Sequence, residues 1–182
     1  MDNQQERLDF EIGYLLGIID GEGHYGLKPE WNKQRKRYFY PEVVIANSNP
    51  EIITKCSETL KKLEIPHYIY TPKRHRKEKI PVTRILIKGM KRINKFCQVL
   101  GQYPSAKLLQ LNTLKEFCDM RLSIPLTELC NSTNTYSEKE LWYKNRVSEL
   151  NGLYSSKAKI LRDYTLDALP KSDDIVRTYA KV

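Results

Sequence analysis

The first strongly periodic segment of the chain is residues 10–20, where apolar side chains recur at intervals of three and four. Its apolar positions are Ile12, Leu15, Leu16, Ile18 and Ile19, and it contains no proline. This spacing predicts one buried helix, because residues three and four apart lie on the same helical face. The glycines on either side of Glu22 predict its end.

Two hairpins are predicted from β-branched, aromatic and alternating patterns. Residues 24–29 and 37–46 are interpreted as strands joined by a polar, basic turn. In the second strand, Phe39, Val43 and Ile45 share one face, and Tyr38, Tyr40 and Glu42 share the other. Residues 68–71 and 82–87 are interpreted as a second hairpin, whose tip is basic.

Three further helices are predicted around these hairpins. Asn49 followed by Pro50 is typical of a helix start, and helical spacing continues from there to Pro66. Apolar stripes predict two more helices, over residues 90–100 and 106–121. The resulting order, αββαββαα, is that of an α+β fold.

The chain changes character after Pro125. Ser137 and Glu140 have the spacing of a capping box, which predicts a short helix toward Leu150. Few apolar residues that could pack into a core follow in residues 153–182. We therefore predict a core domain at residues 1–122 and a helical and loop extension at residues 123–182. Basic residues 157, 159 and 162 in this extension are interpreted either as a solvated face or as further contacts to a nucleic acid backbone.

Composition and charge exclude several classes of protein. Lys and Arg number 31 and Asp and Glu 22, which gives a net charge of +9, and 40% of the residues are hydrophobic. This is typical of a folded, basic protein. The longest apolar run falls far short of the roughly 18 residues of a membrane span, and no secretion signal is visible. We expect a cytoplasmic protein, or an organellar one if it is organelle-encoded, that is not secreted. The four cysteines and three histidines have no metal-ligand spacing.

The segment from Gly21 to Gly26 matches the pattern GxGxxG of dinucleotide-binding proteins. Such a site needs a strand before the glycines and a helix after them, so that helix amides meet the phosphates. Here a helix precedes and a strand follows, and Glu22 would repel a phosphate. The order of the elements around the pattern therefore argues against nucleotide binding.

Two acids stand where the first predicted helix ends. Asp20 and Glu22 lie at the negative end of the helix dipole, so they either remain solvated or hold a cation. Gly13 and Gly17 lie on one face of the same helix and would let a second backbone approach closely. Two copies packed in this way would bring two Glu22 carboxylates together, and two adjacent carboxylates require either a divalent ion or a shared proton.

Residues 15–23, LLGIIDGEG, resemble the LAGLIDADG motif of the homing endonucleases. Seven of the nine positions are identical or conservative; Leu16 and Gly21 stand where alanine is usual, and Glu22 where aspartate is usual. The predicted order αββαββα is also that of this family, with an antiparallel saddle of strands that binds DNA. Only one motif is present, and single-motif members act as homodimers.

The resemblance implies roles for individual residues. Glu22 and the Gly21 carbonyl would bind Mg²⁺, and Glu22, Lys107 and Asn47 would be catalytic. Asn47 is equally well interpreted as a turn residue before Pro50. Gly13, Leu16, Gly17 and Asp20 would form the dimer interface.

The two hairpins carry the residues that we expect to bind DNA. Basic and aromatic side chains are concentrated there, which favours phosphate binding over a merely solvated surface. Antiparallel strand pairs fit the major groove, where Arg84 suits guanine edges. The predicted set is Gly26, Lys28, Glu30, Lys33, Arg35, Lys36, Arg37, Tyr38, Tyr40 and Glu42 in the first hairpin, and Lys73, Arg74, His75, Arg76, Lys77, Lys79 and Arg84 in the second.

The resemblance implies an intron-encoded, Mg²⁺-dependent homing endonuclease that cuts both strands of a long pseudo-palindromic DNA site and leaves short 3′ overhangs. Two alternatives use the same scaffold. One is an RNA-splicing maturase, for which intron RNA would be a partner. The other is a regulator that only binds DNA. Retention of Glu22 favours cleavage.

Overall fold

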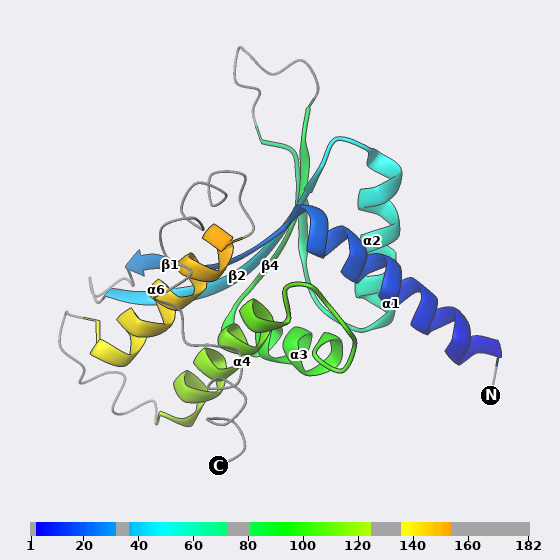
Figure 1. Cartoon of the computed structure of the whole chain (residues 1–182). Coiled ribbons are helices and arrows are strands. Elements are labelled where there is room, and N and C mark those ends of the chain that lie inside the picture. Colours follow the sequence, from blue (N-terminus) through cyan, green and yellow to red (C-terminus); the bar gives the residue numbers. More distant parts are fainter. Residues whose placement is uncertain (1–2, 32–36, 73–80, 125–135, 154–182) are drawn as a thin grey trace.

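A computed structural model describes residues 3–31, 37–72, 81–124 and 136–153. The predicted order αββαββαα is confirmed, and the helix predicted after Ser137 follows it as α6 (Figure 1). The elements are α1 (Asn3–Glu22), β1 (Gly23–Trp31), β2 (Arg37–Asn47), α2 (Pro50–Lys62), β3 (Tyr68–Tyr70), β4 (Thr83–Lys88), α3 (Met90–Leu100), α4 (Leu108–Ser123) and α6 (Glu138–Leu153). None of the described helices is long and apolar enough to cross a membrane.

The strands form one antiparallel sheet in the order β1-β2-β4-β3. Because side chains alternate across a strand, one face carries the apolar set, in which Tyr25 lies opposite Val43 and Ile45 opposite Ile85. All four are fully buried. The predicted inward face of the second strand, with Phe39, Val43 and Ile45, is therefore confirmed.

The described helices pack on this apolar face. In Figure 1, α3, α4 and α6 lie together on one side of the strands, and α1 and α2 lie side by side at the other end of the sheet. Apolar side chains of α1 to α4 close the core, among them Leu15, Leu60, Phe96 and Phe117, all fully buried. Among the described residues, no helix lies over the second face of the sheet.

Helix α1 is longer than the predicted segment 10–20. Its first turns are polar and exposed, so they carry no hydrophobic period from which a helix could be recognised. It ends at Glu22, where Gly23 begins β1. A Cβ at position 23 would lie 2.5 Å from the carbonyl oxygen of Ile19, which explains the glycine at this sharp change from helix to strand.

The predicted boundary at residue 122 is wrong for residues 138–153. The capping box is confirmed, because Ser137 N donates to Glu140 Oε2 at 3.0 Å and Glu140 N donates to Ser137 Oγ at 3.2 Å. Helix α6 then packs against α4 and β1. Arg121 of α4 forms an ion pair with Glu140 at 2.9 Å, and Asn151 Nδ2 donates to the carbonyl of Tyr25 at 2.7 Å. Helix α6 therefore belongs to the core domain.

Leu150→Ala tests whether α6 belongs to the core. Leu150 is 1% exposed, so the variant should lose about 2–5 kcal/mol of unfolding free energy in chemical denaturation. Leu141→Ala, on the exposed side of the same helix at 41% exposure, should change it by less than about 0.5 kcal/mol. A loss of unfolding free energy in Leu150→Ala as small as that in Leu141→Ala would show that α6 is an appendage.

Candidate active site

The last residue of α1, Glu22, is exposed and is held by one specific partner. Asn47, at the end of β2, donates from Nδ2 to Glu22 Oε2 at 2.7 Å. The other end of the same amide, Oδ1, accepts from the backbone N–H of Asn49 at 2.7 Å. Both interpretations of Asn47 are thus compatible with the structure, since this side chain turns the chain before α2 and also fixes one oxygen of Glu22.

Lys107 is buried at the same end of α1, at 7% exposure. Its Nζ donates to the carbonyl of Ile19 at 2.9 Å and to that of Gly23 at 2.6 Å. These carbonyls lie at the negative end of α1, whose last turn has no basic residue of its own. Burial lowers the pKa of Lys107 below its ordinary value, and Asp20 opposes part of that shift. Lys107 therefore stabilises the end of α1 and the position of Glu22.

Asp20 fastens the segment before α4 to the same end of α1. Its carboxylate accepts from Ser105 Oγ at 2.6 Å, from Ala106 N at 2.9 Å and from Lys107 N at 3.2 Å. The site thus combines α1, the end of β2 and the start of α4. Asp20, predicted at a dimer interface, makes these contacts within its own chain.

Lys107→Met should lower the unfolding free energy by about 2–4 kcal/mol, because it leaves two carbonyls at a helix end without a donor. Chemical denaturation measures this. Lys91→Met removes the same charge from an exposed position on α3 and should leave the stability nearly unchanged. An unchanged stability in Lys107→Met would contradict the structural role of this lysine.

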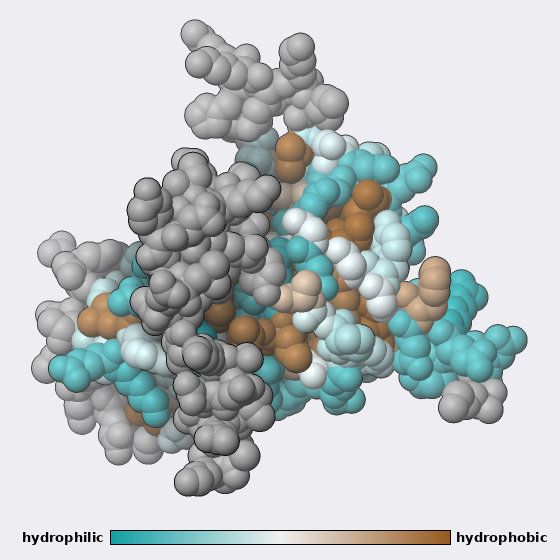
Figure 2. Space-filling view, in the orientation of Figure 1, coloured by the Kyte–Doolittle hydropathy of each residue, from teal (hydrophilic) through white to brown (hydrophobic). Residues whose placement is uncertain are grey.

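The outer face of α1 is open and lined with glycine. A Cβ added at Gly13, Gly17 or Gly21 would meet no atom within 4 Å, and Phe10 on the same side is 76% exposed. Over α1 the visible surface carries hydrophobic and near-neutral residues among hydrophilic ones (Figure 2). The interface prediction is corrected at Leu16, which is 3% exposed and packs into the core of its own chain.

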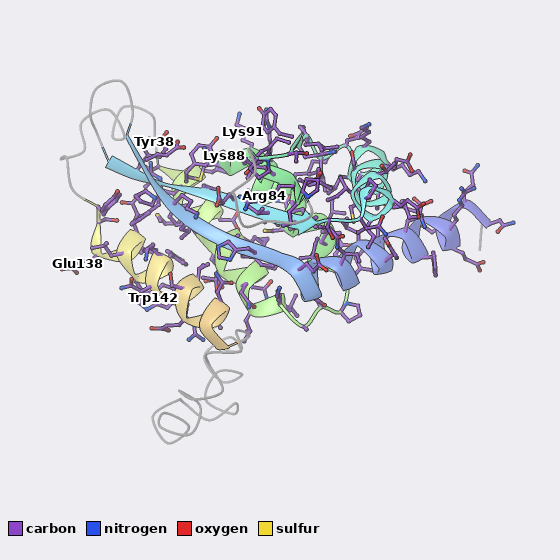
Figure 3. All side chains as sticks on the ribbon, turned by 90° about the horizontal axis from the view of Figure 1, so that it is seen from above. Tyr38, Arg84, Lys88, Lys91, Glu138 and Trp142 are labelled. Carbon is purple, nitrogen blue, oxygen red and sulfur yellow. The ribbon has the colours of Figure 1, made fainter. Side chains whose placement is uncertain are left out.

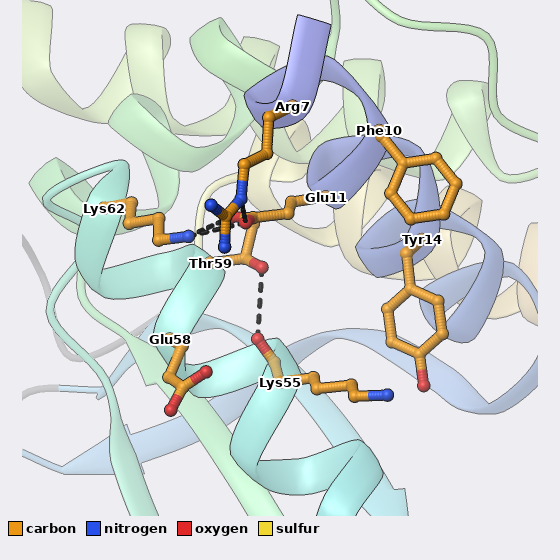
Figure 4. Close-up of a pocket in the computed structure, with 8 residues that line it drawn as sticks. All are labelled: Arg7, Phe10, Glu11, Tyr14, Lys55, Glu58, Thr59 and Lys62. Atoms are coloured by element: carbon orange, nitrogen blue, oxygen red, sulfur yellow. Dashed lines mark hydrogen bonds and ion pairs between the residues drawn. The ribbon is translucent and has the colours of Figure 1, made fainter. Parts of the chain in front are cut away.

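A groove between α1 and α2 adjoins this face (Figure 4). It measures about 460 Å³, and Phe10 and Tyr14 line its α1 side. On the same wall Glu11 accepts hydrogen bonds from Lys62 Nζ at 2.6 and 2.5 Å, which hold the pKa of Glu11 below its ordinary value. These bonds tie α1 to α2.

The uncovered face of the sheet forms a groove of about 530 Å³, and Glu22 and His24 lie in its wall. Figure 3 shows Tyr38, Arg84 and Lys88 on one side of the strands, and Glu138 and Trp142 of α6 on the other. Seven residues predicted to bind DNA lie on this face: Gly26, Lys28, Glu30, Tyr38, Tyr40, Glu42 and Arg84. Arg37 begins β2. The remaining nine, Lys33, Arg35, Lys36, Lys73, Arg74, His75, Arg76, Lys77 and Lys79, lie outside the described residues.

Sequence reasoning missed several residues of this face. His24, Tyr70, Leu86 and Lys88 line the groove but were not predicted. Alternation along β4 places Leu86 and Lys88 on the same face as Arg84, so this signal was available in the sequence. Tyr70 offered no such signal, because β3 spans only three residues and its orientation depends on the pairing of Tyr70 with Arg84.

The end of α1 presents two oxygen donors suited to a cation. The Glu22 carboxylate and the Gly21 carbonyl are hard oxygen donors of the kind that Mg²⁺ prefers, and Glu22 is exposed. Among the described residues, no cluster of three or more His, Cys, Asp or Glu side chains could enclose a metal. The residues fit an ion that takes its other ligands from groups outside this set of side chains.

Comparison with known proteins identifies the family of this chain. Residues 9–101 match the family model of the LAGLIDADG-like domain, which is about half of the chain. The chain belongs to the LAGLIDADG-like family. The matched region includes Glu22, Asn47 and the whole sheet, whereas Lys107 and α6 lie beyond it. A search of the curated proteins found no match to this sequence.

Solved structures of LAGLIDADG homing endonucleases share the fold. The homing endonuclease I-CvuI, in complex with an I-CreI DNA target that is not cleaved, is 11% identical with a TM-score of 0.57, over 79% of this chain and 83% of that one. The archaeal intron-encoded I-Vdi141I, complexed with DNA, is 16% identical with a TM-score of 0.51, over 79% and 98%. The meganuclease I-SmaMI, bound to uncleavable DNA, is 14% identical with a TM-score of 0.53, over 79% and 43%.

Proposed function

We propose that this LAGLIDADG-like protein is a site-specific DNA endonuclease that acts as a homodimer and uses Mg²⁺. One observation carries the proposal. Glu22 is an exposed carboxylate at the end of a glycine-faced helix, it is fixed by Asn47, and it lies in the wall of the uncovered sheet groove. A duplex lying on that sheet would place a phosphodiester beside Glu22.

The reaction is hydrolysis of one phosphodiester in each strand. A water oxygen bonds to phosphorus and the bond to the 3′ oxygen breaks, which leaves a 5′ phosphate and a 3′ hydroxyl. A bound Mg²⁺ would activate this water and stabilise the leaving oxygen. Glu22 and the Gly21 carbonyl would hold it, and Asn47 would keep the carboxylate in one orientation.

A homodimer follows from the number of sites that a double-strand break needs. One chain supplies a single Glu22, and the open face at Gly13, Gly17 and Gly21 lets a second α1 approach closely. The coverage of the structural neighbours supports one unit per chain, because this chain aligns with 83% and 98% of two of them but with 43% of a third. Two copies of one protein would recognise a pseudo-palindromic site.

Incubation of a randomised double-stranded DNA library with the full chain and Mg²⁺ tests the proposal. We expect a limited set of cut sequences, and none when Ca²⁺ replaces Mg²⁺. Sequence-specific binding with Mg²⁺ and with Ca²⁺, but without any cut product, would overturn the nuclease and favour the DNA-binding regulator. Selective binding of structured intron RNA over DNA would favour the maturase.

A further inference from the structure

The uncovered face of the sheet carries an ion pair that joins two strands across a third. Lys88 Nζ of β4 donates to Glu30 Oε1 of β1 at 2.5 Å, over the intervening β2. The lysine and glutamate side chains are 29% and 35% exposed, so a ligand in the groove can reach both. This pair is a polar feature of the DNA-facing groove that the proposed cleavage chemistry does not use.

Two tyrosines of β2 fix the geometry of this pair. The Tyr38 hydroxyl donates to the second oxygen of Glu30 at 3.0 Å, and Lys88 Nζ lies 4.5 Å from the centre of the Tyr40 ring. The hydrogen bond from Lys88 lowers the pKa of Glu30, and the same bond raises the pKa of Lys88. Both groups therefore stay charged at neutral pH, in one fixed arrangement.

The pair is poorly suited to a phosphate. Glu30 cancels the charge of Lys88 and would repel an anion, so a duplex gains little from placing its backbone here. Base edges differ from the phosphate backbone, because they present hydrogen-bond donors and acceptors without net charge. The Glu30–Lys88 pair offers both kinds of group side by side.

A G·C base pair matches these groups in the major groove. Guanine O6 and N7 accept, and the neighbouring cytosine N4 donates. Lys88 has three N–H donors, of which one is used by Glu30, so two remain for O6 and N7. A carboxylate oxygen of Glu30 can accept from cytosine N4 while keeping its protein partner, because each oxygen has two lone pairs. An A·T pair would place the acceptor O4 and the methyl group of thymine on the side of Glu30.

We infer that Glu30 and Lys88 together read one G·C base pair in each half of the DNA target. This inference rests on the proposed function, since it needs a duplex in the sheet groove. Tyr38 and Tyr40 act as positioning residues, because they hold Glu30 and Lys88 without themselves being needed at the base edge.

Selection of bound sequences from a randomised double-stranded library tests the inference. The full chain is used with Ca²⁺, and the recovered sites are compared between the native protein, Lys88→Gln and Glu30→Gln. We expect the native protein to favour G·C at one position of each half-site. Either substitution should reduce that preference roughly tenfold or more and leave the other positions unchanged.

Lys95→Gln is the matched control. Lys95 lies on α3, away from the sheet groove, and its Nζ forms an ion pair with Glu64 at 3.0 Å. The Lys95→Gln variant therefore also removes one positive charge and one ion pair. It should leave every position of the site unchanged. Thermal melting of each variant shows whether the fold is retained, and Lys88→Met provides a second test of the lysine if Lys88→Gln unfolds.

Three outcomes would overturn the inference. A G·C preference that survives both substitutions would exclude the pair as its reader. A uniform loss of affinity across all positions would identify Lys88 as a phosphate contact instead. If the native protein recovers no common sequence, the proposed function itself fails, and the inference fails with it.

Discussion

Glu22→Gln should strongly slow DNA cleavage while leaving DNA binding intact. Glutamine keeps the length of the side chain and an oxygen that can accept from Asn47 Nδ2, so the end of α1 should stay in place. It removes the negative charge that would hold the cation. Because the ion contributes several kcal/mol to the transition state, we expect a loss in cleavage rate of about a hundredfold or more. Single-turnover cleavage of a recovered site measures the rate.

Glu51→Gln is the control for this experiment. It makes the same change at an exposed acid in the first turn of α2, and it should cut at the native rate. Binding affinity measured in Ca²⁺ separates cleavage from recognition. A Glu22→Gln protein that still cuts at the native rate would show that Glu22 is not the group that holds the metal.

Gly17→Glu should convert a dimer into a monomer without unfolding the chain. Position 17 faces open space, so the new side chain meets nothing in its own protein, and replacing a helical glycine favours the helix by up to about 1 kcal/mol. In a dimer packed through this face, however, the side chain would separate the two helices and place two carboxylates against each other. Sedimentation equilibrium gives the mass, and double-strand cleavage should disappear together with the dimer.

Thr54→Glu adds the same charge at an exposed position of α2 and should leave the mass and the cleavage unchanged. If Gly17→Glu has the mass of a dimer and cuts both strands, the glycine face of α1 is not the interface. A native chain that is monomeric even when bound to DNA would contradict the homodimer outright.

Elements with a strong hydrophobic period were predictable from the sequence, because their pattern shows directly which face they bury. The first helix, both hairpins and the faces of β2 follow from this rule. Helix α6 was underestimated, since its buried residues Tyr143, Val147 and Leu150 stand among polar ones. Their burial depends on α4 and β1, which lie far away in the sequence.

The site was predictable in its residues but not in its contacts. Glu22 and Asn47 were named from the motif and the strand end, and the structure brings them to 2.7 Å. Lys107 was named as a catalytic residue, but the sequence did not show that its ammonium donates to two backbone carbonyls. One signal was present: α1 ends without a basic residue, so its negative end needs a cation from elsewhere. The sequence alone does not say which lysine supplies it.

Mapping both cut ends, strand by strand, in DNA recovered from the cleavage reaction tests the central claim most directly. We expect one break in each strand, with the two breaks related by the two-fold symmetry of the flanking bases and dependent on both Mg²⁺ and Glu22. Nicks in a single strand, breaks without symmetric flanks, or the absence of any break in DNA that is specifically bound would contradict a homodimeric endonuclease.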